Sequence, residues 1–394
     1  MGSVRNALPR TVLVLGFVSL LNDAASEMIT PLLPIFLTAT LGAGPAIVGL
    51  VEGFAEATAS VLKLVAGRLA DRGVPAKRLV LGGYGLANVS RPLIGLAAGW
   101  ATVLVLRFLD RVGKGLRSAP RDALIAAAVG PDQRGRAFGF HRSMDHFGAV
   151  IGPLLAFALL SLQVDLKNVF LASVVPGVLV MLLLWLGLPH DGPKVAVPAP
   201  ARLEWRALHG RLRAMIVAAG VLALASVPEA FVVLWAHDRG LAIAWVPLVW
   251  AAASLVKMGL AMPAGILSDR VGRVPVLLGG WAARVAVLLA LATVNPNALG
   301  VWALFLAYAA TLAVTEPAER SLIGDHAGLG ERGTAFGLYH LASGLMALPG
   351  AVLFGLVWER WGSGAAFVAA AAVTAAGATC LVWLGRGARH VPAA

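Results

Sequence analysis

Cysteine and charge are both scarce in this chain, and each shortage excludes a class of protein. Cys380 is the only cysteine among 394 residues, so the chain cannot form an internal disulfide or a thiolate metal cluster. Charged residues make up 13% of the chain and hydrophobic residues 59%, with a mean hydropathy of +0.83. Soluble domains carry about 25% charged residues. A chain this poor in charge cannot cover a water-facing surface, so we expect an integral membrane protein.

The motifs of common catalytic sites are also missing. We find no nucleophile–base motif, no metal-hydrolase spacing and no phosphate-binding loop, so we expect neither an enzyme nor a bound cofactor. No small-residue cleavage site follows the apolar residues after Arg10. The sequence therefore predicts that this first stretch is a membrane-spanning helix and not a cleaved signal peptide.

Long apolar stretches joined by short loops fill most of the chain. A helix that spans a bilayer needs about 20 mostly apolar residues. The expected fold is therefore an all-α membrane protein with twelve transmembrane helices. We place them at residues 10–38, 45–68, 77–97, 100–124, 134–160, 168–187, 212–236, 244–267, 274–293, 298–324, 332–358 and 363–385.

The net charge of +12 is unevenly distributed over the predicted loops. Most of the 32 Lys and Arg residues fall in loops and termini on one side of the twelve helices, and the opposite side holds only Lys167, Arg239 and Arg360. Positively charged loops stay in the cytoplasm, so we expect an inner or plasma membrane protein with both termini cytoplasmic. The charge is a topology signal and does not indicate nucleic-acid binding; the expected partner is the lipid bilayer.

A short polar loop occurs twice, which divides the chain into two similar halves. Its two Asp-Arg pairs begin at Asp71 and Asp269, 198 residues apart. At the same offset, R-G-R-A-F-G at 134–139 aligns with R-G-T-A-F-G at 332–337. We expect two pseudo-symmetric six-helix bundles, a known transporter plan. They cover residues 1–187 and 212–394 and are joined by a cytoplasmic linker at 188–211.

Acidic residues lie inside the first two predicted helices. Asp23 and Glu27 are four residues apart and share one face of the first helix, and Glu56 lies deep in the second. Acids in a bilayer cost several kcal/mol unless they are paired or hydrated. They are candidates for a proton or substrate site facing a cavity, with Arg107 on the fourth helix as the positive partner. The alternative is a set of structural ion pairs with basic groups on neighbouring helices.

Further polar residues occur in the fifth and seventh predicted helices. Arg142 and Asp145 on the fifth helix and Glu229 on the seventh complete the candidate cavity set. A metal site is an alternative use of the fifth helix, although hydrogen bonds or pairing with Arg142 are the plainer interpretation. The metal candidates within two helical turns are His141, Met144, Asp145 and His146.

The repeated loop resembles the signature of the major facilitator superfamily, roughly G-x-L-x-D-R-x-G-R. The second copy matches at Gly265, Leu267, Asp269, Arg270, Gly272 and Arg273. The first copy matches at Gly67, Asp71 and Arg72, but its next glycine, Gly73, arrives one residue early. Two copies at corresponding places in a twelve-helix chain extend the resemblance over its whole length. The resemblance implies the major facilitator fold, whose two halves rock about a central cavity.

The resemblance also implies roles for the loop residues. The loops would lock the cytoplasmic side, with Asp71 capping a helix N-terminus of the other half. Arg72 would pair with an acid at the end of the fourth helix, for which Asp122 is our candidate. The alternative is that Asp71 and Asp269 only shape tight turns. The expected gating set is Gly67, Asp71, Arg72, Asp122, Gly265, Asp269 and Arg270.

Two further matches to the family concern coupling. Arg107 resembles the helix-4 arginine that the family associates with proton coupling. Gly148, Gly152 and Pro153 resemble the start of the helix-5 signature associated with antiporters. Ala156 and Phe157 stand where glycines would complete that signature.

The expected function is secondary active transport by alternating access, as a monomer and without a nucleic-acid partner. We expect proton-coupled efflux, by antiport, of a small lipophilic or amphipathic molecule. Trp235, Trp245 and Trp250 either line the cavity or form an interfacial belt. The alternatives are a proton-coupled importer of a metabolite or of a metal cation or chelate, and a membrane receptor that does not transport.

Overall fold

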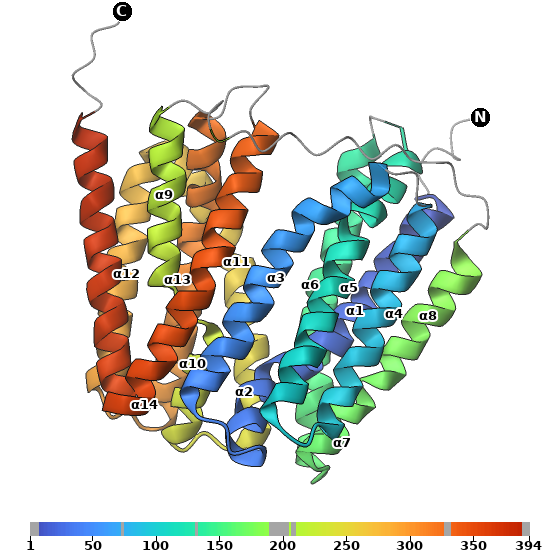
Figure 1. The fold of residues 1–394 in the computed structure, drawn as a ribbon, viewed down its shortest axis with the longest axis horizontal. Coiled ribbons are helices and arrows are strands. Elements are labelled where there is room, and N and C mark those ends of the chain that lie inside the picture. Colours follow the sequence, from blue (N-terminus) through green and yellow to red (C-terminus); the bar gives the residue numbers. More distant parts are fainter. Residues whose placement is uncertain are drawn as a thin grey trace, which may run out of the picture. The chain divides into compact units, whose positions relative to one another are not determined.

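The computed structural model describes residues 8–71, 75–130, 133–188, 205, 210–326 and 332–387. Every one of the twelve predicted stretches is helical in it (Figure 1). The helices are α1 (Arg10–Ile29), α2 (Leu33–Ile35), α3 (Pro45–Asp71), α4 (Ala76–Leu93), α5 (Trp100–Ala127), α6 (Arg134–Ser161), α7 (Leu166–Ala172), α8 (Val174–Gly187), α9 (Gly210–Leu224), α10 (Glu229–Asp238), α11 (Val246–Val271), α12 (Arg273–Thr293), α13 (Ala298–His326) and α14 (Arg332–Gly387).

Several predicted spans are interrupted or merged, and backbone features explain the following cases. The first span breaks after Ile29 into a 3-10 turn at Thr30–Leu32, α2 and a π turn at Phe36–Thr40. Prolines within it lack the N–H that an α-helix interior needs. The seventh span breaks between α9 and α10, and Pro228 immediately precedes α10. The last two spans form α14, which turns at Gly362 with φ +86°, a conformation that glycine adopts readily.

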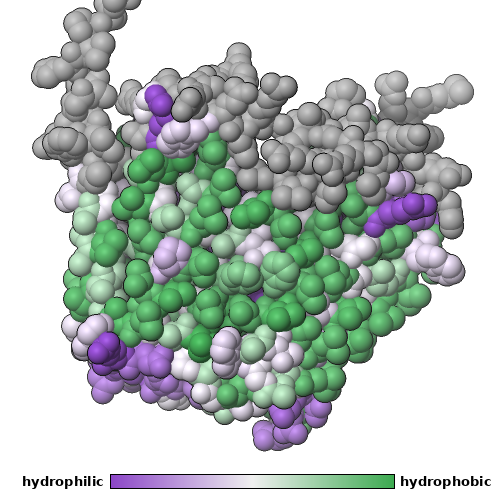
Figure 2. Space-filling model, in the orientation of Figure 1, coloured by the Kyte–Doolittle hydropathy of each residue, from purple (hydrophilic) through white to green (hydrophobic). Residues whose placement is uncertain are grey.

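Membrane-spanning character is clear for most of these helices. Nine segments of the described residues are long and apolar enough to cross a bilayer. The helices α4 and α5 are not among them, and α5 alone carries seven charged residues. Hydrophobic residues cover most of the helix surfaces visible in Figure 2, and hydrophilic residues gather near helix ends.

Residue contacts divide the chain into two compact units. Unit 1 comprises Met1–Phe36, Thr58–Pro200 and Ile243–Ala251; unit 2 comprises Leu37–Ala57, Ala201–Ala242 and Ala252–Ala394. The predicted linker at 188–211 lies largely outside the described residues, so the bundle boundaries at 187 and 212 stay predictions.

Glycines allow the helices of unit 1 to pack closely. A Cβ at Gly148 would overlap the backbone of Leu20, and one at Gly152 would overlap that of Ala24, so α6 lies directly against α1. A Cβ at Gly83 of α4 would come within 2.6 Å of the Gly113 carbonyl of α5. The helix α6 runs through Pro153 without a break.

Unit 2 repeats part of this packing with different side chains. A Cβ at Gly350, 198 residues after Gly152, would lie 2.7 Å from the Leu224 carbonyl, so α14 packs on α9. Further along α14, Phe354 and Trp358 pack against Phe231 of α10, with ring centroids 4.6 and 5.7 Å from it. Glu359 accepts a hydrogen bond of 3.2 Å from the Ala46 N–H at the start of α3.

Candidate functional site

A buried ion pair lies at the centre of unit 1. Arg91 of α4 donates through Nε to Asp110 of α5 at 2.9 Å, and the two residues are 2% and 1% exposed. The same guanidinium donates through Nη1 to Asn22 Oδ1 of α1 at 2.9 Å and to Asn88 Oδ1 at 3.3 Å. One arginine therefore joins three helices. Its ion pair and hydrogen bonds offset the cost of burying its charge.

Two more arginines approach the same carboxylate. Arg107 Nη1 lies 3.8 Å and Arg111 Nε 3.5 Å from Asp110 Oδ2. An ion pair joins Arg107 to Asp110 on its own helix; its predicted role as the positive partner of Asp23, Glu27 and Glu56 stays a prediction. The spacing of three residues explains this ion pair, because it places both side chains on one face of α5.

Two further cations extend the charged face of α5. The Arg117 guanidinium lies 4.3 Å from the centre of the Tyr84 ring, and the residue is only 4% exposed. Its Nε and Nη1 atoms are buried without a hydrogen-bond partner among the described residues, as is the Tyr84 hydroxyl. Lys114 is exposed, and no described carboxylate lies within ion-pairing distance of its amine.

Electrostatic interactions connect seven ionisable residues, which we call the central charge cluster. They are Asp23, Arg91, Arg107, Asp110, Arg111, Lys114 and Arg117. Five of the seven are cations and two are carboxylates, and counting Asp145, which acts on Asp23 from outside the cluster, gives three carboxylates. The cluster is electropositive by either count. Such an excess is costly at membrane depth.

Asp23 is the member of this cluster that lies on α1, and a second acid is near it. Asn22 Nδ2 donates to its Oδ1 at 2.9 Å, and Asp145 of α6 lies within electrostatic reach. Among the described residues, no basic side chain is close enough to Asp23 for an ion pair. The α1–α6 packing at Gly148 brings these two predicted cavity residues together.

Asp145 has its own partners. Ser19 of α1 donates a hydrogen bond to Oδ1, His141 Nδ1 lies 3.6 Å from Oδ2, and Arg142 Nη1 lies 3.8 Å from it. Of the metal candidates, His141 and Asp145 thus lie together, while His146 is exposed. Among the described residues, no group of three or more His, Cys, Asp and Glu side chains could hold a metal ion.

Glu27 is paired with a tryptophan. Trp250 of α11 donates through Nε1 to Glu27 Oε2 at 2.9 Å, and Trp250 is 8% exposed. The other two candidate tryptophans behave differently. Trp245 is exposed and lies 5.5 Å from the Phe157 ring, while Trp235 is fully buried. Of the three, Trp250 is therefore the one that contacts a predicted site acid.

The remaining predicted cavity acids lie in unit 2. Glu56 is exposed and belongs to this unit, whereas Asp23 and Glu27 belong to unit 1. Glu229 at the start of α10 binds Lys257 Nζ of α11 through both carboxylate oxygens at 2.9 Å.

The second polar loop is held by a network around Arg273. This arginine pairs with Asp269, and its Nε lies 3.0 Å from Asp325 of α13. Gly272 adopts φ +102° just before it, which favours glycine at that position. Gly265 lies within α11, and Arg270 is exposed.

The first polar loop lies mainly outside the described residues. Arg72 lies outside the described residues, and so do the side-chain surroundings of Gly67 and Asp71. Asp122 binds its neighbour Arg121 at 2.8 Å and is half-exposed. The predicted Arg72–Asp122 pair therefore stays a prediction.

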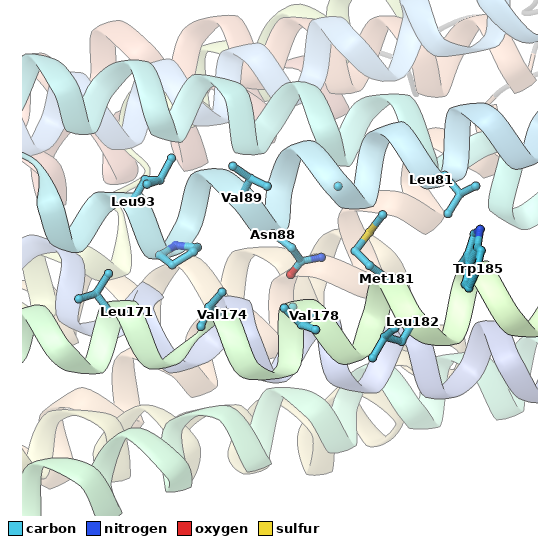
Figure 3. A pocket seen from close by; sticks show the side chains of 13 residues that line it. Leu81, Asn88, Val89, Leu93, Leu171, Val174, Val178, Met181, Leu182 and Trp185 are labelled. Carbon is cyan, nitrogen blue, oxygen red and sulfur yellow. The ribbon is translucent and has the colours of Figure 1, made fainter.

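An apolar groove of about 650 Å³ runs between α4 and α8 on unit 1 (Figure 3). Val89 and Leu93 of α4 line one side, and Val178 and Trp185 of α8 line the other. All four are at least 40% exposed. Asn88 is the polar side chain among its lining residues. The groove therefore suits hydrocarbon and differs in chemistry from the central charge cluster.

Three contacts of this site were not predicted from the sequence. Sequence reasoning did not pair Arg91 with Asp110, did not connect Ser19 to Asp145, and did not place Asp325 beside the second loop. The first pair had a usable signal. Both residues interrupt apolar stretches joined by a short loop, and both occur well inside their predicted helices.

The comparisons with known proteins agree with this architecture. The sequence model of the Major Facilitator Superfamily matches residues 15–260 and 230–394. An uncharacterized MFS-type transporter of Methanocaldococcus jannaschii is 30% identical over 363 residues, covering 89% of each chain. A bacterial homologue of the human lysosomal transporter Spinster, crystallised inward-facing and occupied, has TM-score 0.78 at 17% identity, covering 95% of this chain and 96% of that one.

A shorter match concerns part of a drug-resistance protein. The multidrug resistance protein MdtH of Salmonella newport is 31% identical over 142 residues, which is 36% of this chain and 35% of that protein.

Proposed function

Because the chain belongs to the Major Facilitator Superfamily, we propose that it moves a small molecule across the membrane by proton-coupled alternating access. Efflux by antiport of a lipophilic or amphipathic compound is the proposed mode. The partial match to MdtH and the glycines at 148 and 152 support this mode.

The proposal rests on the ability of Asp23 to be both protonated and ionised. A proton carrier must exist in both charge states during one cycle, and a tight ion pair would hold a carboxylate ionised. Asp23 has a neutral amide partner in Asn22 and a nearby acid in Asp145. Asp110, by contrast, is surrounded by arginines and is suited to a permanent structural charge. We therefore assign proton transfer to Asp23, with Glu27 as the second candidate.

Proteoliposomes with an imposed pH gradient test this proposal. Internal pyranine would report proton movement while fluorescent amphipathic probes of positive, neutral and negative charge report transport. We expect Asp23→Asn to abolish probe-dependent proton movement, and Glu27→Gln to reduce it, while both proteins still insert. The matched control is Asp165→Asn, because Asp165 is an exposed acid of the same unit. Normal coupled transport by both single variants would refute the assignment.

The candidate gating residues are proposed to act on a separate step. Asp269 and Arg270, with Asp71 and Arg72 at the other copy, would stabilise one closed state. Their loss should change transport rate without removing proton coupling.

A further inference from the structure

We propose that the central charge cluster binds the anionic group of the transported molecule, at Lys114 and Arg117. The inference rests on the proposed transport function but not on its antiport mode. It assigns a substrate class, amphipathic organic anions with a carboxylate or phosphate group.

The first argument is the charge balance of the cluster. Its five cations face two carboxylates, and Asp110 is already shared by Arg91, Arg107 and Arg111. Asp23 is the remaining acid, and it reaches both Lys114 and Arg117 without forming an ion pair with either. An excess of positive charge inside a membrane domain calls for an anion.

The second argument is the unused hydrogen-bonding capacity at Arg117. Buried polar atoms normally have partners, and each exception needs an explanation. Arg117 Nε and Nη1 have none within the described part of the chain, although the residue is 4% exposed. The neighbouring Tyr84 hydroxyl is also buried without a hydrogen-bond partner among the described residues. A guanidinium presents its donors in a fixed fork that matches carboxylate and phosphate oxygens.

The third argument is accessibility. Lys114 lies one helical turn from Arg117 on α5, and it is exposed while Arg117 is buried. A ligand oxygen can therefore meet the lysine first and the guanidinium second. No comparable set of cations occurs on α13, where residues 312 and 315 are Leu and Thr.

Binding in nanodiscs of zwitterionic lipid tests the inference without a pH gradient. Titration calorimetry would compare octyl phosphate and octanoate with octyltrimethylammonium and octyl glucoside, which carry the same chain. We expect the two anions to bind at least about tenfold more tightly than the cation or the sugar. Equal binding of the cation would overturn the proposal. Inorganic phosphate binding as tightly as octyl phosphate would overturn the amphipathic part of it.

Substitutions locate the site. Arg117→Gln and Lys114→Gln should each weaken octyl phosphate binding about tenfold or more, whereas Arg117→Lys should keep most of it. Lys167→Gln is the control, because Lys167 is an exposed cation of the same unit. If Arg117→Gln does not fold, the exposed Lys114 decides the question. Unchanged binding in Lys114→Gln would then refute the site.

Asp23 supplies a test that separates the two proposals. An ionised Asp23 competes with a bound anion for the same cations, so Asp23→Asn should bind octyl phosphate more tightly than the wild type. Weaker binding by this variant would count against the anion site. Tighter binding means that proton and anion bind together, which favours the importer alternative over antiport. Proton exchange with a cationic probe would support antiport and refute the anion class.

Discussion

The helices α5 and α13 occupy corresponding places in the two halves, yet their interiors differ. At an offset of 198 residues, Arg107, Asp110 and Arg117 of α5 correspond to Phe305, Tyr308 and Thr315 of α13. Phe305 is a buried aromatic residue, Tyr308 donates to the Val227 carbonyl at 2.5 Å, and Thr315 accepts from Arg284 at 2.7 Å. One helix thus carries a charged face where the other carries hydroxyl groups and hydrocarbon.

The two halves share a close contact between helices but not the buried charges. Gly152 and Gly350 are 198 residues apart, and each brings its helix against the backbone of the first helix of its half. Helix packing and the buried polar side chains are therefore subject to different physical constraints. Close helix contact needs only small residues, whereas buried charge must be balanced locally. Among the described residues, the buried arginines and the buried aspartate all lie in unit 1.

The largest expected effect comes from breaking the charge balance of α5. Asp110→Asn removes the carboxylate that three nearby arginines share, and we expect a loss of about 3–5 kcal/mol in the free energy of unfolding. Tyr308→Phe at the corresponding position removes one hydrogen bond and should cost about 1–2 kcal/mol. Unfolding by SDS titration measures both. Equal losses would mean that the two interiors do not differ as described.

An intermediate effect is expected at the shared glycines. Gly152→Ala and Gly350→Ala each force a methyl group against helix backbone and should lose about 1–3 kcal/mol. Gly139→Ala is the control, because nothing lies within 4 Å of its added Cβ. The same titration compares the three variants. A large loss in only one of the two equivalent glycines would show that the scaffold is not shared at this contact.

The smallest effect concerns the part-exposed ion pair between Glu229 and Lys257 in unit 2. Glu229 and Lys257 are 20% and 31% exposed, so solvent screens their attraction in part. A double-mutant cycle with Glu229→Gln and Lys257→Met should give a coupling of about 1 kcal/mol. A coupling as large as the Asp110 effect would place a second charge-dependent centre in unit 2 and weaken the contrast.

Helix positions could be predicted because the bilayer sets the length of an apolar span. The break near Pro31 could be anticipated for a similar reason, since proline removes a backbone donor. The break before Pro228 was not predicted. It falls in a stretch whose composition alone reads as one continuous span.

Pairing between helices was harder to predict than helix position. Residue type showed that Arg107 and Asp23 needed partners, but not which face of each helix they occupy. Arg117 is buried against Tyr84, because glycines at 83 and 113 allow α4 and α5 to pack closely. Such depth and rotation depend on tertiary packing, which a single sequence does not encode locally.

The indole that binds Glu27 has one more consequence. An indole N–H can donate but cannot accept, and it carries no charge of its own. Either form of the carboxyl group offers it an oxygen, so the Trp250 contact tolerates both a proton on Glu27 and its departure. A lysine in that position would favour only the ionised form. The neutral donor leaves this acid oriented while its charge changes, as a titrating switch would require.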